Sequence, residues 1–338
     1  QAIVAEIADK ILQTVSRPIS LGNIEVALSA SIGISRFPEH GETAGVLMHA
    51  ADLAMLQAKN SGRAAHAVYC AEMDERVQFS LGVERRLQQA LDQGGLLLHY
   101  QPIVNLTSGK VEGVEALLRL DDGAMPLIEP ATFIPIAESC GLILPLGQWV
   151  SQEACRQQVR WHADGLPLTI SVNVSAVQFG RAGFSGRVRD LIKQSGIDPH
   201  HLVIELTETA ILERLDEAVE TLRELKRLGV RIALDDFGTG YSSLSYLSTL
   251  PLDKIKIDQS FVRRIESDHV SRAVIDAVIA LARSMDLELV AEGIETEAAL
   301  RYLQERGCHQ GQGYYFSRPL PQADLETWYR QRLLPAPP

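Results

Sequence analysis

Polar side chains recur at or near the ends of short apolar runs along the chain, where a sheet would be buried. The set comprises Glu115, Asn173, Glu205, Asp235, Asp236, Lys256 and Glu292. A carboxylate at the end of a buried strand is costly unless another group compensates its charge. The repetition therefore predicts that these residues converge on one site.

The residue types in this set predict a site for hard metal ions. Oxygen ligands without histidine or cysteine favour Mg²⁺ or Mn²⁺ over zinc. We expect Glu115, Asn173, Glu205 and Asp235 to surround one ion, and Asp236 to bind a second ion that Asp235 bridges. Two ions about 3.5–4 Å apart suit the in-line displacement of an ester oxygen at phosphorus by an activated water.

Two further residues would complete such a site. Glu292 is a candidate general base for the water or a ligand of the second ion, and Lys256 would orient the water or stabilise developing charge. Successive strand residues point in opposite directions, so Asp235 and Asp236 would face one site only if the strand has ended and the loop has turned. A purely structural interpretation stays open for some of these groups, since Lys256 could pair with Asp258 and Glu208 could cap a helix.

These residues lie within a repeating pattern of strands and helices. The expected strands are 96–103, 111–120, 168–175, 202–207, 231–235, 254–258, 288–291 and a short one near 308–312. The expected helices are 131–139, 147–163, 216–228, 271–285 and 297–304, preceded by an amphipathic helix over 73–93. Eight strands alternating with helices predict an α/β protein with a (β/α)8 TIM-like barrel, whose C-terminal face carries the site. An open doubly wound sheet is the alternative, although no G-x-G-x-x-G follows the first strand.

The first 70 residues have a different pattern. A helix over 3–15, a strand over 26–35 and a helix from Thr43 to about Lys59 are expected. One or two strands do not close a sheet. We therefore expect three regions: a truncated α+β domain at 1–72, a linker and first barrel helix at 73–93, and the barrel at 94–338.

Composition narrows the class of protein. The net charge is −11 and no run of Lys or Arg stands out, which argues against binding to long nucleic acids. The four cysteines form no C-x-x-C pair, as expected of reduced thiols in a cytosolic protein. We expect a cytoplasmic piece of a longer protein without membrane contact of its own, any sensor or membrane segment lying upstream.

Eight ordered motifs over about 80–325 resemble the EAL-domain cyclic di-GMP phosphodiesterases. They are Y-Q-P-I-V (100–104), E-A-L-L-R (115–119), N-V-S (173–175), E-L-T-E (205–208), D-D-F-G-T-G-Y-S-S (235–243), K-I-D-Q-S-F (256–261), A-E-G-I-E-T (291–296) and G-Q-G-Y-Y-F-S-R-P-L (311–320). The resemblance implies a phosphodiesterase that opens cyclic di-GMP to linear pGpG with two Mg²⁺ or Mn²⁺ ions. It implies that Glu292 is the general base and that Lys256 is the lysine at the water and metal site. The implied metal ligands are Glu115, Asn173, Glu205, Asp235 and Asp236.

The resemblance also implies roles for residues outside that set. Arg119 matches the arginine at the substrate phosphate. The expected substrate-binding residues also include Gln101, Asp258, Gln312 and Pro319, and Glu208 and Glu295 are expected to anchor the D-D-F-G-T-G loop. A homodimer through the segment after Asp236 is expected, and cyclic di-GMP is the expected ligand.

The N-terminal segment resembles the C-terminal half of a GGDEF diguanylate cyclase domain. The match rests on L-S-A-S-I-G-I and A-D-L-A-M-L-Q-A-K-N-S-G-R. The signature hairpin is absent from it, so we expect no cyclase activity from this remnant. Two alternatives to the enzyme remain: a catalytically silent receptor for cyclic di-GMP, and a dimeric regulatory scaffold.

Overall fold

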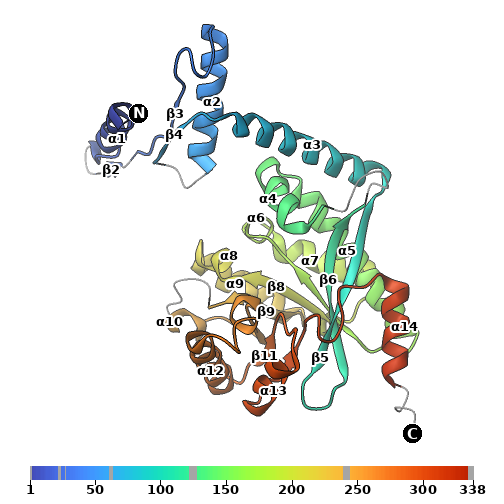
Figure 1. Cartoon of the computed structure of the whole chain (residues 1–338). Coiled ribbons are helices and arrows are strands. Elements are labelled where there is room, and N and C mark those ends of the chain that lie inside the picture. The colour runs from blue at the N-terminus through green and yellow to red at the C-terminus, as the bar shows by residue number, and fades with distance from the viewer. Residues whose placement is uncertain are drawn as a thin grey trace. The chain divides into compact units, whose positions relative to one another are not determined.

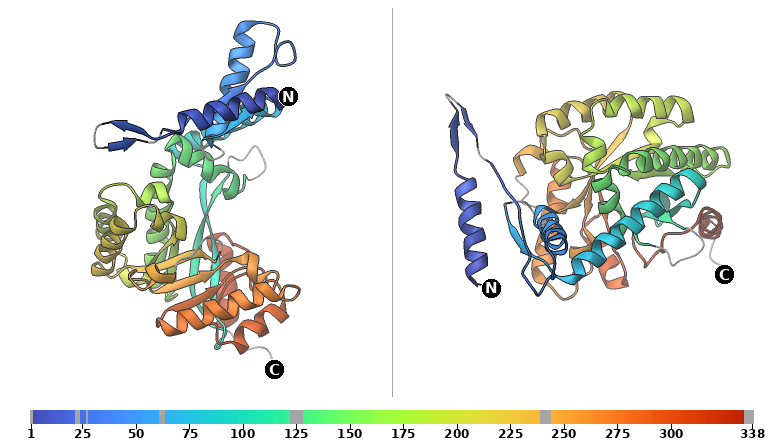
Figure 2. Two further views of the ribbon diagram at one scale, coloured as in Figure 1. Left: turned by 90° about the vertical axis from the view of Figure 1, so that its left-hand side faces the viewer. Right: turned by 90° about the horizontal axis from the view of Figure 1, so that it is seen from above.

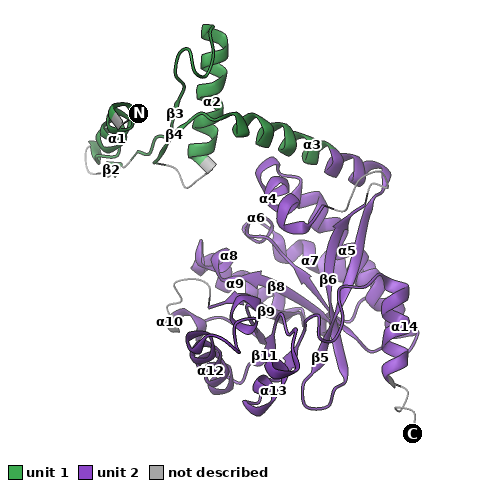
Figure 3. Ribbon diagram, viewed as in Figure 1, with its two compact units in different colours: residues 1–85 green, residues 86–338 purple. Residues whose placement is uncertain are grey.

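The structure is a computed structural model that describes residues 2–21, 24–26, 28–60, 64–121, 128–238 and 244–333. The chain divides into two compact units, residues 1–85 and 86–338, with the division inside one long helix, α3 (Ala71–Gln93) (Figure 3).

The first unit contains short elements. They are α1 (Ala2–Val15), β1 (Ile19–Leu21), β2 (Ile24–Val26), β3 (Ile32–Ile34), α2 (Ala44–Asn60) and β4 (His66–Val68). β1 and β2 form an antiparallel pair, and β3 and β4 form a parallel pair. The expected strand over 26–35 is therefore wrong in extent, because 28–31 belong to no strand and the two ends pair with different partners.

α2 begins as the sequence predicts. The Thr43 hydroxyl accepts a hydrogen bond from the Val46 backbone N–H at 3.4 Å, which satisfies a donor that the first helical turn leaves free. Leu53 and Ala54 of α2 then pack with Met73 of α3 in a small core.

The second unit is a closed eight-stranded barrel. Its strands, in order around the barrel, are β5 (Leu96–Asn105), β6 (Val111–Leu120), β7 (Thr169–Asn173), β8 (Leu202–Thr207), β9 (Arg231–Phe237), β10 (Lys254–Ile257), β11 (Glu288–Ala291) and β12 (Gln310–Gly311). The predicted barrel class is confirmed. The expected bounds of three strands, 111–120, 202–207 and 288–291, match the structure.

Helices lie outside these strands (Figures 1 and 2). They are α4 (Pro130–Cys140), α5 (Ile143–Ala163), α6 (Ala176–Phe179), α7 (Phe184–Ser195), α8 (Glu208–Leu212), α9 (Leu215–Arg227), α10 (Leu244–Leu247), α11 (Gln259–Val262), α12 (His269–Ser284), α13 (Glu297–Glu305) and α14 (Gln322–Leu333), with a 3₁₀ turn at Pro199–His201. Trp161 of α5 is fully buried, stacks edge-on against Tyr100 of β5 and donates a hydrogen bond to Glu326 of α14 at 2.9 Å.

One strand departs from the expected alternation. β5 runs antiparallel to both of its neighbours, β6 and β12, whereas all other adjacent pairs are parallel. The short connection 106–110 explains this, because a parallel neighbour needs a crossover of a dozen or more residues. The first strand therefore presents its N-terminal half, not its C-terminal end, at the mouth of the barrel.

Candidate active site

Six acidic and basic residues from five strands meet at one mouth of the barrel. Glu115 comes from β6, Glu205 from β8, Asp235 and Asp236 from β9, Lys256 from β10, and Glu292 directly follows β11. Glu115 lies in the middle of its ten-residue strand, so the expectation that it ends a strand is wrong. Because barrel strands are tilted and staggered, residues at different positions along them reach the same level.

The ammonium of Lys256 lies at the centre of this group. Its Nζ is 2.5 Å from Glu205 Oε2, 2.6 Å from Glu292 Oε1 and 3.1 Å from Asp235 Oδ1. Glu115 Oε2 is 3.5 Å away. A lysine that is 1% exposed requires such compensation, because an isolated buried charge is strongly disfavoured. The alternative pairing of Lys256 with Asp258 is not the arrangement found.

Amides fix the carboxylate of Glu115. Asn173 at the end of β7 donates from Nδ2 to Glu115 Oε1 at 2.6 Å. Gln312, just after β12, donates from Nε2 to Glu115 Oε2 at 2.6 Å and to Glu292 Oε1 at 3.3 Å. Glu115, Asn173, Gln312 and Glu292 therefore form one connected hydrogen-bonded group.

A β-bulge lets Asp235 and Asp236 face the same space. Between Leu234 and Phe237 of β9 there are three residue steps, but the matching stretch of β10, Ile255 to Ile257, has only two. Asp236 takes a positive φ of 55°, which turns the extra residue toward the mouth. The expectation that the strand must end first is wrong, since β9 continues to Phe237.

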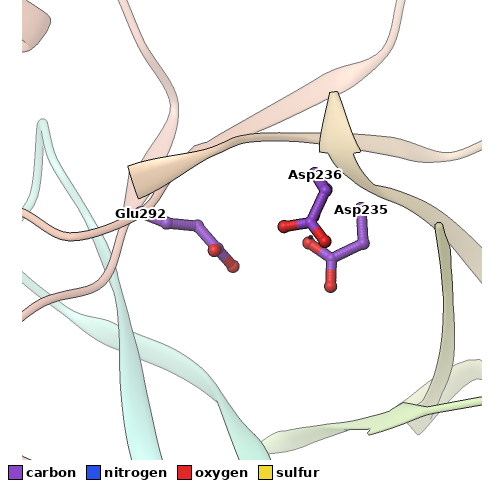
Figure 4. A group of neighbouring side chains, drawn as sticks. All are labelled: Asp235, Asp236 and Glu292. Carbon is purple, nitrogen blue, oxygen red and sulfur yellow. Dashed lines mark hydrogen bonds between the residues drawn. The ribbon is translucent and has the colours of Figure 1, made fainter. Parts of the chain in front are cut away.

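Three carboxylates of this group could hold a metal ion. The ligand oxygens of Asp235, Asp236 and Glu292 lie within 4.8 Å of one another. Figure 4 shows all three side chains pointing into the same space, with Glu292 on the side opposite the two aspartates.

The balance of charge shifts the pKa values at the mouth. Burial alone would lower the pKa of Lys256, but the surrounding carboxylates, first Asp235 and Glu115, raise it well above its usual value. Burial and neighbouring acids raise the pKa of Glu205 to about 8 and that of Asp236 to about 6, and they raise that of Glu292 well above its usual value. The charge of Lys256 alone does not balance the carboxyl groups that surround it. Bound cations would reduce the remaining negative charge.

A cavity of about 490 Å³ opens beside the acidic group. Gln101, Arg119 and Pro319 line it, together with Glu115, Glu292 and Gln312. Gln101 is opposite Glu115 in the β5–β6 pairing, and Arg119 is four residues further along β6. The half-buried Arg119 thus adds a positively charged group to a cavity that the acidic residues Glu115 and Glu292 also line.

The three remaining predicted residues have different positions, and Asp258 and Glu208 are not among the residues that line this cavity. Asp258 follows β10 and accepts a hydrogen bond from the Ser260 backbone N–H at 3.0 Å, so it caps α11. Glu208 is buried in the first turn of α8, whose N-cap is Thr207 rather than Glu208. Glu295 lines the cavity and pairs with Arg263 at 2.8 Å.

The sequence prediction missed several residues of the cavity wall, including Gln259, Arg263 and Tyr314. Tyr314 is 47% exposed, and the guanidinium of Arg318 lies 4.4 Å from its ring centre. Gln259 follows the end of β10 by two residues, and Tyr314 follows the end of β12 by three. The rule that loops after barrel strands carry the site would have found both.

Family comparisons agree with this geometry. The EAL domain matches residues 84–319, and the diguanylate cyclase GGDEF domain matches residues 1–65. The chain belongs to the EAL domain family. A partial GGDEF domain precedes its EAL domain.

Named relatives of this EAL protein include enzymes of cyclic di-GMP metabolism. It is 42% identical over 325 residues to the bifunctional diguanylate cyclase/cyclic di-GMP phosphodiesterase MucR of Pseudomonas aeruginosa, covering 95% of this chain and 47% of MucR. It is 37% identical to the cyclic di-GMP phosphodiesterase PdeR of Escherichia coli, covering 98% of this chain and 50% of PdeR. The chain thus spans about half the length of these relatives.

A solved structure of the PaMucR phosphodiesterase in complex with c-di-GMP superposes with a TM-score of 0.70 at 42% identity. The match covers 72% of this chain and 99% of that one. No helix in the described part of this chain combines the length and apolar character needed to span a membrane.

Proposed function

We propose that the barrel unit is a phosphodiesterase that hydrolyses cyclic di-GMP to linear pGpG with two Mg²⁺ or Mn²⁺ ions. The observation that carries this proposal is the convergence of Asp235, Asp236 and Glu292 beside a cavity lined by Arg119. MucR and PdeR, whose names include this phosphodiesterase activity, support the same substrate.

The donor set fits two divalent cations. We assign Glu115, Asn173, Glu205 and Asp235 to one ion and Asp235 and Asp236 to the second. These residues offer only carboxylate and amide oxygens, which suit Mg²⁺ or Mn²⁺. When bound, the ions would acidify a water molecule and neutralise charge on the phosphate.

The protein's own residues would bind the substrate and move a proton. Arg119 would hold a phosphate through its guanidinium, with Gln101, Gln312, Pro319 and Asp258 near the nucleotide. Glu292 would accept a proton from the attacking water, whose oxygen forms the new bond to phosphorus. The ester bond from phosphorus to O3′ breaks, and the leaving O3′ takes a proton from solvent. Lys256 would stabilise the negative charge that develops on the phosphate oxygens.

The loop after Asp236 is proposed to join two copies of the chain. Residues 239–243 of this loop lie outside the described residues, and α10 follows them. A cytoplasmic location of the protein accords with the proposed substrate. Glu208 and Glu295 are proposed to anchor the loop after Asp236. Titrating Mg²⁺ against activity in wild type and Glu208→Ala would test the anchor. We expect Glu208→Ala to lower kcat and to weaken binding of the second metal ion, so that more Mg²⁺ is needed for half-maximal activity. Identical curves would contradict the coupling.

A direct assay tests the function. The 338-residue chain is incubated with cyclic di-GMP and Mg²⁺, Mn²⁺, Ca²⁺ or EDTA, and pGpG is measured by chromatography. We expect turnover with Mg²⁺ or Mn²⁺ and poor activity with Ca²⁺, which prefers more ligands at longer distances. Binding without turnover would indicate a silent receptor, and neither binding nor turnover would indicate a scaffold. Full activity in excess EDTA would exclude the metal-dependent reaction.

A further inference from the structure

A second cavity lies on the outer side of the barrel wall, within the same unit. It has a volume of about 420 Å³ and lies between α5 and α7, against β7 and β8. Val172 and Ile204, which point outward from these strands, form part of its floor. They alternate with Asn173 and Glu205, whose side chains belong to the acidic group inside, so the strands separate the two cavities.

The lining of this outer cavity is mainly apolar but includes two cations. Leu144, Val172, Val188 and Ile204 are among its apolar residues, and Arg181 and Arg187 line it as well. Cavities of this size and composition are typical of small-molecule sites, in which a few polar groups fix the orientation of an otherwise apolar ligand.

The two arginines lack an acidic partner. Across the described ranges of the chain, no carboxylate lies within ion-pair distance of Arg181 or Arg187. Arg187 instead donates hydrogen bonds to the carbonyl oxygens of Ala182 at 2.8 Å and Arg181 at 3.1 Å. Its guanidinium also lies 5.8 Å from the ring centre of Phe184. Asp190 also lines the cavity, so the two guanidinium groups and one carboxylate leave its described lining with an excess of positive charge.

A buried amide adds a third donor. Gln178 is 8% exposed and lines the cavity next to Gly147. Its Oε1 accepts a hydrogen bond from the Ser175 backbone N–H at 3.1 Å. Its Nε2 makes no hydrogen bond to any other described residue. The Nε2 amino group can therefore donate a hydrogen bond to a ligand oxygen in the cavity.

We propose that this outer cavity binds an aliphatic carboxylate, such as a medium-chain fatty acid. The carboxylate would accept charge-assisted hydrogen bonds from Arg181 and Arg187, with the Gln178 amide as a further donor. The hydrocarbon chain would cover Val172, Val188 and Ile204, where removal of apolar surface from water favours binding. A neutral hydrocarbon would leave the arginines unpaired, and a small anion would leave the apolar wall exposed to water.

This proposal does not depend on the phosphodiesterase activity. The test is therefore direct binding, using the full chain and sodium decanoate as the probe in isothermal titration calorimetry. We expect one saturable site with a Kd below about 1 mM. Decanol, which has the same chain without the charge, should bind at least about tenfold more weakly, as expected for the loss of a charge-assisted contact.

A charge reversal locates the head group. Arg181→Glu should weaken decanoate binding by about a hundredfold, because it replaces attraction by repulsion. Arg189→Glu is the matched control, since Arg189 is exposed on α7 and does not line the cavity. The control should bind as wild type does. Equal binding by both variants would overturn the proposal, as would decanol binding as tightly as decanoate or the absence of saturable binding.

A cavity-filling variant locates the tail. Leu191 lines the cavity from α7 and is half-buried, so Leu191→Trp should occupy part of its volume. We expect decanoate binding to be lost while the thermal unfolding midpoint stays near that of wild type. Retained binding in a folded Leu191→Trp protein would place the ligand elsewhere and overturn the proposal. If this variant does not fold, the Arg181→Glu comparison decides.

Discussion

At the scale of single residues, Lys256 explains why so many acids can be buried at one mouth. It approaches Glu205, Glu292 and Asp235 within 3.1 Å, and it is itself almost fully buried. The lysine and the carboxylates stabilise one another, because either charge alone would be uncompensated in the barrel interior. The same mouth is the proposed position of two metal ions, which would take over part of this compensation.

Lys256→Met should therefore destabilise the metal-free protein strongly. Breaking a buried ion pair by removing one partner costs about 3–5 kcal/mol. The measurement is urea unfolding in EDTA and in excess Mg²⁺, where we expect Mg²⁺ to restore part of the loss. Lys254→Met is the control, since Lys254 is also buried but pairs with Glu288 and Gln310 instead. Equal recovery of both variants by Mg²⁺ would contradict the proposed metal position.

Glu292→Gln should lower kcat for cyclic di-GMP by about 10²–10⁴-fold, the usual contribution of a general base. The amide keeps the shape of the side chain but does not accept the proton of the attacking water. Steady-state pGpG production measures the effect. Glu297→Gln is the control, because Glu297 is exposed on α13 and pairs only with Arg301 among the residues described. A wild-type rate for Glu292→Gln would remove Glu292 from the mechanism.

At the scale of secondary-structure elements, close contact between α5 and α6 supports the turn that follows Asn173 at the end of β7. Ser175 and Gln178 form a capping box at the start of α6, two residues after Asn173. Gly147 of α5 leaves room for the Gln178 side chain, because a Cβ at position 147 would lie 1.7 Å from Gln178 Nε2.

Gly147→Ala should consequently lower the free energy of unfolding by about 1–3 kcal/mol, since the new methyl group displaces Gln178 from the capping box. Gly186→Ala provides the control on α7, where an added Cβ meets no atom within 4 Å. There we expect a gain of about 0.5–1 kcal/mol from helix propensity. Denaturant unfolding of both variants measures the difference. Similar stability changes in the two would show that the contact at Gly147 is unimportant.

At the scale of the whole molecule, the two units differ in how much structure they contain. Unit 2 closes its barrel with eight strands, and each strand has two neighbours. Among its described residues, unit 1 holds two separate pairs of strands. A closed barrel has no free edge and buries its own core, so it does not need other strands to complete its sheet.

A chain of residues 71–338, which retains all of α3, should fold and hydrolyse cyclic di-GMP with the same dependence on Mg²⁺ as the full chain. Circular dichroism and pGpG production measure the two properties. The 338-residue chain is the reference, and Glu292→Gln in the shorter chain is the inactive control. An unfolded fragment would show that unit 1 is required for the barrel to form, contrary to this expectation.

The sequence by itself determined the barrel and most of its elements. The alternation of apolar strands with helices of 3.6-residue periodicity is a local property, and it predicted the strands 111–120, 202–207 and 288–291 with the bounds observed. It also selected Glu115, Lys256 and Glu292, because buried polar groups are unusual enough to stand out in apolar runs. The eight motifs then indicated the family.

Tertiary structure alone decided how those elements and residues meet. The reversed direction of β5 and the bulge at Asp236 depend on pairing with neighbouring strands, which local periodicity does not record. The partners of Lys256 come from strands up to 141 residues away along the sequence. The outer cavity likewise forms only when α5 and α7 pack against β7 and β8. Such contacts depend on register and stagger in the closed barrel, so only the assembled fold defines them.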